Sequence, residues 1–329
     1  MVRASPEDLR VSIVVPVRNR RAMLRRLLEA VVPQLAPDGE LIVVDDGSED
    51  GSAEEVLAVA AAGHPVRLVR GSGEGAVAAR RLGVEVAGGK ILGFTDSDCV
   101  PAPGWIAAGV AAIGRGADVV QGVTTPARPP GPLERSMWVQ REDGLYATCN
   151  VFYRRDAFDA AGGFDATAEV RLGFRHGRRA RGLGFGEDTL LAWRVRRRGR
   201  AEFEPEAKVV HEVHPPDLRE SISRAWMAGA FPALVREVPE LRRTLLWSGL
   251  FLGRSRLPLY GSMLAASLRR RHVARGLCAW WVLHHAHGAW SQERLPARLP
   301  RVLLMRLGLD ALVGVALAWG SLRAGIVVL

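Results

Sequence analysis

The sequence predicts an α/β fold in which helices flank a sheet, followed by a C-terminal helical region associated with a membrane. Short apolar runs rich in β-branched residues alternate with segments whose apolar residues recur at helical spacing. Four such alternations predict parallel strands joined by right-handed crossovers. The strand runs are almost entirely apolar, as expected when helices cover both faces of a sheet.

The predicted elements follow one another in a regular order. The first strand, Val11–Val15, ends at Pro16 and precedes a helix marked by Leu24, Leu27 and Leu28. Three more strand and helix pairs follow: Leu41–Val44 with Ala53–Ala61, Val66–Val69 with Ala76–Val86, and Ile91–Thr95 with Trp105–Ile113. Because ligands of such sheets bind at the carboxyl ends of the strands, we expect the functional residues there.

Composition divides the chain into three predicted regions, residues 1–123, 124–240 and 241–329. The proline-rich stretch Thr124–Pro132 cannot continue a helix or a central strand, so it is predicted to be a loop or hinge after the first region. Within the second region, Ala166–Gly186 is rich in glycine and arginine and is predicted to be a mobile loop.

The positive charge of the chain belongs to its last region. The whole sequence carries a formal net charge of +10. Residues 241–329 contain thirteen arginines, no lysine and two acidic residues, whereas the other 240 residues contain 32 basic and 33 acidic ones. A nucleic-acid-binding protein would present its charge on the folded part of the chain, so we expect no nucleic-acid partner.

The last region is also apolar. Its longest apolar stretches, Leu245–Leu252, Gly276–Leu283 and Leu307–Leu322, are each shorter than the roughly 20 residues that a spanning helix needs. Arginine-flanked segments of this length are typical of helices that lie in the membrane interface. The alternative is a helical subdomain packed on the rest of the protein, with His284, His285 and His287 as interfacial or packing residues.

The cysteines and the N-terminus indicate a reduced, cytosol-facing protein. Cys99, Cys149 and Cys278 are odd in number and far apart, which does not fit a disulfide framework or a zinc ribbon. The chain begins MVRASPEDLR and passes directly into the first strand, without the apolar run of a secretion signal.

Acidic residues follow the predicted strands. Asp46 follows the second strand, and Asp96 and Asp98 follow the fourth. Asp46 or Ser48 can instead cap the next helix, but two carboxylates in one short turn repel each other unless a cation or a shell of hydrogen-bond donors compensates them. Mg²⁺ or Mn²⁺ prefers such oxygen ligands together with substrate phosphates, so Asp96-x-Asp98 predicts a metal-diphosphate site.

The glycines of Gly71–Gly75 lie before a helix but lack the spacing of a dinucleotide fingerprint. They exclude an NAD or FAD interpretation and allow the backbone to turn close to a ligand. Arg80 on the following helix can reach a phosphate, or it can belong, with Arg81, to a solvated helix face.

Two further motifs lie in the second region. Glu187 and Asp188 begin an amphipathic helix, where Asp188 is either a cap or a general base that faces a substrate. His211 and His214 lack the helical spacing and the third ligand of a zinc enzyme. His211 follows an apolar strand and is the candidate for a metal, diphosphate or supporting role.

Five segments together resemble the family 2 glycosyltransferases, which have the GT-A fold. The segments are VSIVVPVRNR, LIVVDDGSEDGS, GAVAARRLGVEVAGGKILGFTDSDCVPAPGW, NVFYRRDAFDAAGGFD and GFGEDTLLAWRVRRRG, and they cover roughly residues 10–215. The resemblance implies a Rossmann-like mixed sheet and an inverting, metal-dependent transferase of hexosyl type. It implies a nucleoside-diphosphate-sugar donor and an acceptor that is a glycan or lipid-linked, at the cytoplasmic face of the cell membrane.

The resemblance also implies roles for single residues. Pro16, Asn19, Asp46, Arg80 and Asp96 would bind the donor, Asp96 and Asp98 would hold Mn²⁺ or Mg²⁺, and Asp188 beside Glu187 would be the base. Residues 1–123 would then bind the nucleotide sugar and residues 124–240 the acceptor. A non-catalytic nucleotide-sugar binding module is the alternative function.

The sequence departs from the family pattern in three places. Arg80 and Arg81 stand where many members have Arg-Asn, and Cys99 stands where a third acid is frequent. The Q-x-x-R-W signature of processive synthases is missing after Asp188, which favours transfer of a single sugar.

Overall fold

A computed structural model describes residues 10–131, 133–173, 185–293 and 299–329. The chain forms two compact units, one of residues 1–127 and 137–212 and the other of residues 128–136 and 213–329. The three functional regions inferred from composition remain a prediction.

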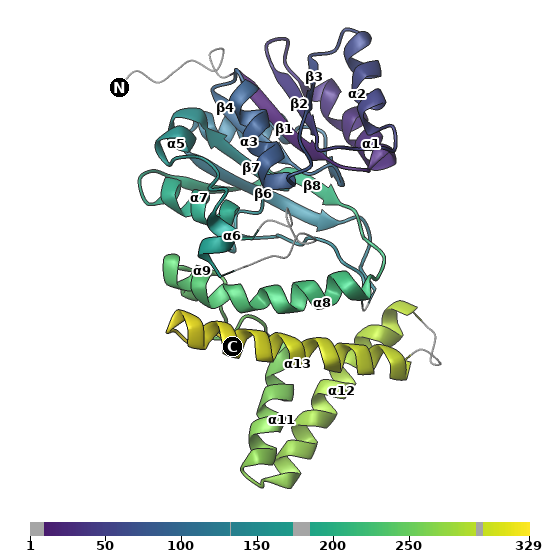
Figure 1. Cartoon of the computed structure of the whole chain (residues 1–329), viewed down its shortest axis with the longest axis vertical. Coiled ribbons are helices and arrows are strands. Elements are labelled where there is room, and N and C mark those ends of the chain that lie inside the picture. The colour runs from purple at the N-terminus through teal and green to yellow at the C-terminus, as the bar shows by residue number, and fades with distance from the viewer. Residues whose placement is uncertain (1–9, 132, 174–184, 294–298) are drawn as a thin grey trace. The chain divides into compact units, whose positions relative to one another are not determined.

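The first unit is built on an eight-stranded sheet with the order β3-β2-β1-β4-β7-β6-β8-β5 (Figure 1). The strands are β1 (Val11–Val17), β2 (Glu40–Asp45), β3 (Val66–Arg70), β4 (Ile91–Thr95), β5 (Cys99–Pro101), β6 (Val119–Pro126), β7 (Asn150–Arg154) and β8 (Ala201–His211). Strands β3, β2, β1 and β4 pair in parallel, β7 is antiparallel to β4 and β6, and β5 is antiparallel to β8. The predicted mixed sheet is confirmed.

Helices cover both faces of this sheet. They are α1 (Arg21–Val31), η2 (Val32–Gln34), α2 (Ser52–Ala61), α3 (Ala76–Val86), α4 (Trp105–Gly114), α5 (Arg155–Ala160), α6 (Ala168–Arg171) and α7 (Glu187–Arg196). Alternate residues of β1 point to opposite faces. Ile13 belongs to the buried cluster that contains Leu24 of α1 and Trp105 of α4. Val14 faces α3, where a Cβ on Gly83 would approach its side chain to 2.5 Å.

All four predicted strand and helix pairs are confirmed, but two proline-based boundaries are wrong. Pro16 lies inside β1, and β6 runs through Thr124 and Thr125 to Pro126, so the predicted loop Thr124–Pro132 begins too early. The physical reason is the same in both cases. Strand β4 pairs with β1 only as far as Val14, so Pro16 has no partner on the β4 side. Strand β7 pairs with β6 only as far as Gln121, so Pro126 has no partner on the β7 side. Neither proline therefore needs to donate an N–H hydrogen bond on that side.

The predicted mobile loop Ala166–Gly186 lies partly outside the described residues, at 174–184. Its described part contains the short helix α6.

Strand β8 contains an irregularity that resets its register. Gly122 of β6 pairs with Glu204, but the next residue, Val123, pairs with Lys208. The side chain of Asn150 compensates for the broken ladder, because its Nδ2 donates to the carbonyl oxygens of Val123 and Ala207, each at 2.8 Å.

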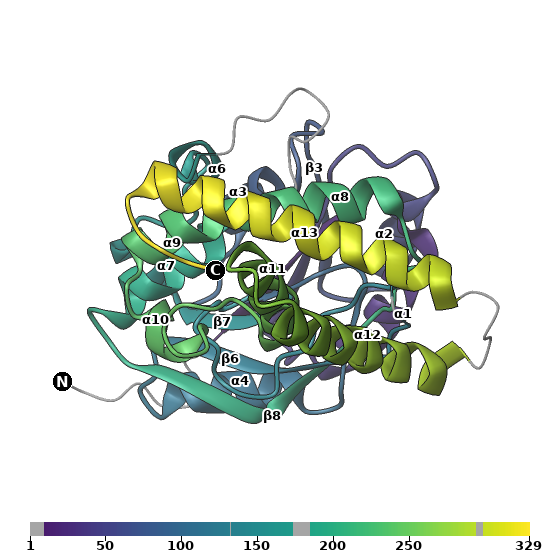
Figure 2. The ribbon, with the colours of Figure 1, turned by 90° about the horizontal axis from the view of Figure 1, so that it is seen from below.

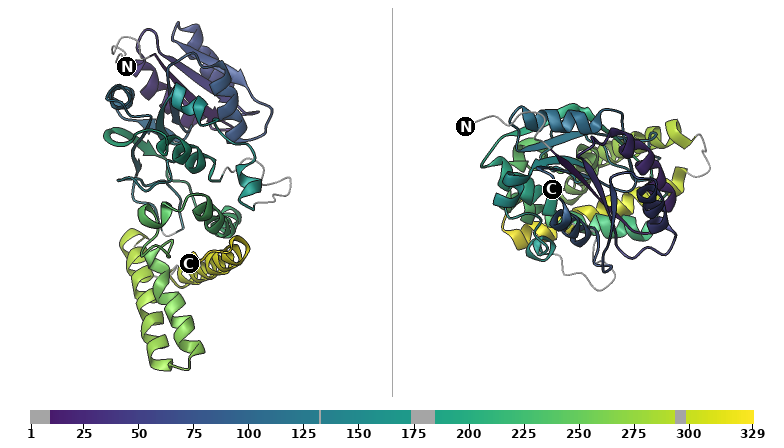
Figure 3. Two further views of the ribbon diagram at one scale, coloured as in Figure 1. Left: turned by 90° about the vertical axis from the view of Figure 1, so that its left-hand side faces the viewer. Right: turned by 90° about the horizontal axis from the view of Figure 1, so that it is seen from above.

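The second unit is helical. It contains α8 (Leu218–Met227), η3 (Ala228–Ala230), α9 (Phe231–Glu237), α10 (Leu241–Thr244), η4 (Arg254–Arg256), α11 (Leu257–Ser267), α12 (Arg271–Glu293) and α13 (Leu299–Ala324). Helix α13 packs on α8, η3 and α9, and α11 packs along α12 as a hairpin (Figures 2 and 3).

Helix α13 is longer than the sequence stretch that marks it. The stretch Leu307–Leu322 was expected to be too short to cross a membrane, but α13 begins at Leu299, because Arg301 and Arg306 do not interrupt a helix. Among the described residues it is the helix that is long and apolar enough to span by length and composition.

The contact between α13 and η3 predicts a large effect of one methyl group. A Cβ on Gly320 would collide with the backbone of Gly229, lying 2.8 Å from its carbonyl carbon. We expect Gly320→Ala to destabilise the protein by about 1–3 kcal/mol through overpacking, measured as a lower midpoint of thermal unfolding.

Gly308 on the same helix is the matched control, because a Cβ there has nothing within 4 Å. Gly308→Ala should leave stability unchanged or raise it by up to about 1 kcal/mol, as alanine does in a helix interior. Equal midpoints for the two variants would contradict the packing of α13 on η3.

Candidate active site

The ends of β1 and β2 are linked by side-chain hydrogen bonds. Asn19, in the left-handed conformation at φ 51°, donates its backbone N–H to Ser48 Oγ at 2.9 Å. Its Oδ1 accepts the N–H of Glu49 at 2.8 Å. Asn19 is exposed and Pro16 is buried, so Asn19 offers the contact surface at this edge.

Asp46, at the end of β2, holds the glycine-rich loop before α3. Its Oδ1 accepts the backbone N–H of Gly73 at 2.8 Å and its Oδ2 that of Gly75 at 2.7 Å. The capping alternative is wrong, because the residue at the N-cap of α2 is Gly51. The loop passes so close that a Cβ on Gly71 would lie 2.8 Å from Asp46 Oδ1.

Arg80 is buried inside the unit and not on a solvated face. Its Nη2 donates to Asp96 Oδ1 at 2.6 Å, and its Nη1 lies 3.9 Å from Glu187 Oε1. Burial opposes the charge of Arg80, but Asp96, Glu187 and then Asp188 outweigh burial and raise the pKa of the guanidinium. Arg81, one residue later, is exposed.

Asp188 combines burial with a nearby cation. Helix α7 begins after Gly186, which has φ 77°, so Glu187 and Asp188 lie in its first turn and Asp188 is not the cap. Burial raises the pKa of Asp188 to about 6, and the Thr189 N–H and Arg80 partly offset that rise. A carboxylate with a pKa near neutrality is suited to accept a proton at physiological pH.

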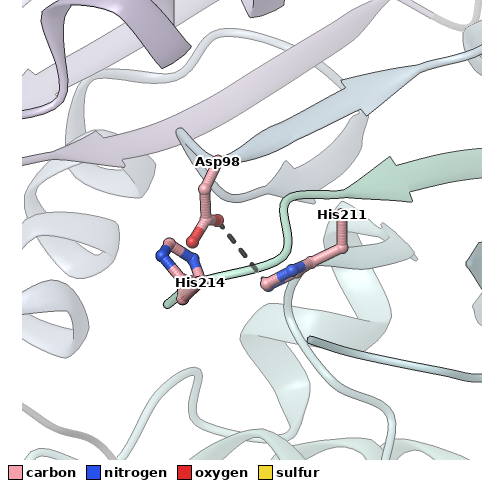
Figure 4. Close-up of side chains that lie close together, drawn as sticks. All are labelled: Asp98, His211 and His214. Atoms are coloured by element: carbon pink, nitrogen blue, oxygen red, sulfur yellow. Dashed lines mark ion pairs between the residues drawn. The ribbon is translucent and has the colours of Figure 1, made fainter. Parts of the chain in front are cut away.

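The register of β5 against β8 brings Asp98 beside His211. Cys99 pairs with His211, and the N–H of Glu212 donates to the carbonyl oxygen of Asp98 at 2.9 Å. As a result Asp98 Oδ1 lies 3.8 Å from His211 Nε2 (Figure 4). His214 follows three residues further along the chain, and the three side chains offer ligand atoms within 4.8 Å of one another.

The tautomer of His211 follows from its neighbour. Nδ1 lies 2.7 Å from the carbonyl oxygen of Glu212, which can only accept a hydrogen bond. Nδ1 therefore carries a proton, and Nε2 is the ring nitrogen on the side of Asp98, where a metal-binding imidazole needs its lone pair. One carboxylate and two imidazoles fit a divalent transition metal such as Mn²⁺.

Sequence reasoning placed several of these residues and missed others. Sequence reasoning found no third ligand near the two histidines, whereas Asp98 lies beside them and offers one. Arg20 forms an ion pair with Asp98 and was not identified; the sequence shows it only as a basic residue directly before the first helix. Asp96 lies with Arg80 and is not a member of the Asp98, His211 and His214 group, so its role as a metal ligand stays a prediction.

Comparison with known proteins identifies the part of the chain that carries Asn19, Asp46, Arg80, Asp96 and Asp98. A sequence model described as Glycosyl transferase family 2 matches residues 12–165. These residues, just under half of the chain, are therefore similar to glycosyl transferase family 2. The resemblance found in the sequence is thereby confirmed.

Relatives extend the match beyond residues 12–165. The chain is 32% identical over 168 residues to Glycosyltransferase AglE of Haloferax volcanii, covering 47% of this chain and 55% of that protein. It is 29% identical over 311 residues to the pre-mycofactocin glycosyltransferase of Mycobacterium tuberculosis, covering 84% of this chain and 60% of that protein. The chain thus spans about three fifths or less of the length of these relatives.

Solved structures confirm the GT-A fold. The mannosyltransferase PcManGT from Pyrobaculum calidifontis, in complex with GDP-Man and Mn²⁺, gives a TM-score of 0.56 at 17% identity and covers 96% of this chain and 88% of its own. TarS 1-349 of S. aureus with UDP-GlcNAc gives 0.50 at 13% identity, covering 97% and 93%.

Proposed function

We propose that the protein is an inverting glycosyltransferase that moves a hexosyl group from a nucleoside-diphosphate sugar to an acceptor hydroxyl with the help of a divalent metal. The observation that carries this proposal is Asp188, whose pKa of about 6 and position next to Glu187 and Arg80 suit a general base. The match to the family 2 model and a fold shared with a GDP-Man complex and a UDP-GlcNAc complex support it.

In this mechanism the acceptor oxygen attacks the anomeric carbon from the side opposite the diphosphate. The carbon–oxygen bond to the acceptor forms as the bond to the diphosphate breaks, and Asp188 takes the hydroxyl proton. Arg80 keeps the pair Asp96 and Glu187 in place. Its fixed charge also keeps Asp188 from an even higher pKa, which leaves the base ionised at neutral pH.

Asp98, His211 and His214 are the residues that would hold the metal. A bound Mn²⁺ or Mg²⁺ would neutralise charge on the departing diphosphate. Arg20 balances the charge of Asp98 and lies at the same strand edge as the donor contacts Asn19 and Asp46.

We infer that the acceptor is a glycan or lipid-linked and that the reaction takes place at the cytoplasmic face of the membrane. The arginines of residues 241–329 and the apolar helix α13 support a membrane surface as a partner.

The test is a release assay for nucleoside diphosphate with UDP-, GDP- and dTDP-sugars, each with Mn²⁺, Mg²⁺ or EDTA. We expect release with one class of donor that is lost in EDTA. Donor binding without release in the presence of lipid and glycan acceptors would favour the alternative, a non-catalytic nucleotide-sugar binding module.

The pKa of Asp188 predicts the acidic side of the pH profile. The base must be ionised, so kcat/KM should fall as the pH drops through about 6 and level off above about 7. Arg80→Gln tests the direction in which Arg80 shifts the pKa of Asp188, because loss of the guanidinium removes a charge that lowers this pKa. The acidic limb should move to higher pH in that variant and stay nearer its place in Arg80→Lys. If the acidic limb of the pH profile does not move in Arg80→Gln, Asp188 is not the group that produces it.

A further inference from the structure

The hairpin of α11 and α12 has a large exposed apolar surface. Six bulky apolar side chains on it are each more than half exposed: Met263, Leu264, Leu268, Val273, Trp280 and Leu283. Trp280 is 61% exposed whereas its neighbour Trp281 is 3% exposed. Trp281 is therefore buried within the second unit, whereas Trp280 and the other five, called here the hairpin face, remain mostly exposed.

The turn of the same hairpin is strongly basic. Arg269, Arg270 and Arg271 connect the two helices, all three are exposed, and Arg275 follows one turn later. The sequence has no acidic residue between Glu240 and Glu293 to balance them. The hairpin thus places an uncompensated cationic cluster at one end of an apolar surface.

The hairpin is held in shape by a buried polar contact. Asp310 of α13 accepts from Arg256 Nε at 3.0 Å and from Trp281 Nε1 at 3.1 Å. This carboxylate joins α12 and η4 to α13, so the outward position of Trp280 is a property of a fixed element.

We propose that the α11–α12 hairpin binds the surface of an anionic lipid bilayer. The hairpin face enters the boundary between headgroups and acyl chains, and Arg269, Arg270 and Arg271 bind lipid phosphates. Arginine suits phosphate oxygens, and tryptophan is enriched at this depth of the membrane. Helix α11 has 11 residues, so at about 1.5 Å per residue it is too short to span.

A second copy of this chain fits the same surface less well. Two hairpins packed face to face in the same direction would bring two arginine clusters together, and in either direction neither helix offers a carboxylate before Glu293 to pair with them. A membrane with anionic headgroups complements both the charge and the apolar side chains. The inference extends the membrane part of the proposed function and does not depend on sugar transfer.

The test uses the full chain in flotation with vesicles of phosphatidylcholine alone or with phosphatidylglycerol. We expect binding that requires phosphatidylglycerol, weakens with salt, and falls on the order of 100-fold in the triple variant Arg269→Gln, Arg270→Gln, Arg271→Gln. The matched control removes three exposed cations of the first unit, Arg81→Gln, Lys90→Gln and Lys208→Gln. Equal losses in the two triple variants would overturn the proposal.

A second measurement reports on the apolar contact. Cys99 and Cys149 are buried, so in a Cys278→Ser background an environment-sensitive dye can be attached through Leu283→Cys, on the same side of α12 as Trp280. The emission of the dye should shift to the blue with phosphatidylglycerol vesicles. This shift should be lost in the triple variant that combines Met263→Ser, Leu264→Ser and Trp280→Ser. A shift caused by self-association without vesicles would instead assign the face to a second copy.

Nucleoside diphosphate release from a soluble donor is measured in the same preparations. Release retained in the hairpin variants with vesicle binding lost supports the proposal. Vesicle binding unchanged in both hairpin variants overturns it, whatever the release assay shows. Failure of release in the wild type with normal vesicle binding concerns the proposed function alone.

Discussion

Asp188→Asn is expected to abolish sugar transfer while leaving donor binding largely intact. The amide keeps the shape of the side chain in the first turn of α7 but cannot take the acceptor proton. General bases contribute about 10²–10⁴-fold to the rate, so kcat should fall by that amount. The measurement is a pair of assays, product formation at saturating donor and donor affinity by calorimetry.

Asp156→Asn is a matched control for this prediction. Asp156 lies in the first turn of α5, as Asp188 lies in the first turn of α7, but Asp156 is exposed. Asp156→Asn should retain wild-type kcat. Full activity in Asp188→Asn would exclude Asp188 from the chemistry, whereas a loss of donor affinity equal to the loss of kcat would assign it to binding.

Asp98→Ala is expected to weaken metal-dependent donor binding. Asp98 is the carboxylate of the group formed with His211 and His214, and its removal leaves only imidazole ligands. Even changes next to a metal ligand cost 10–100-fold in affinity as a rough rule, so a lost ligand should cost at least that. Titration of Mn²⁺, followed by its electron spin resonance signal, measures the effect without any turnover.

Arg20→Gln separates metal binding from folding. It leaves the carboxylate of Asp98 in place and removes the cation that pairs with it. We expect Mn²⁺ to bind more tightly to Arg20→Gln than to the wild type, because the internal competitor is gone. Weaker binding in both variants would indicate that this strand edge is merely disturbed.

The sequence was informative where local rules decide the structure. Strand β4 and helix α3 match their predicted residues because an apolar run of five residues and a helical repeat after glycines leave little choice. Asp46, Asp96 and Asp98 could be placed at strand ends for the same reason, since the end of a strand can be located once the strand is.

The parts that depend on distant partners could not be predicted. Strand β5 has three residues, too few to show a periodicity, yet it places Asp98 next to His211. Arg80 looks like a surface residue in its own helix. Only the contacts with Asp96 and Glu187 explain its burial.

The irregular pairing of β8 has a consequence for how this chain tolerates changes in length. One residue inserted among Pro205, Glu206 and Ala207 falls where the ladder with β6 is already interrupted. One residue inserted between Lys208 and His211 would instead turn the imidazole to the opposite side of the strand, away from Asp98. Insertional scanning should therefore find two adjacent stretches of a single strand, one permissive and one intolerant.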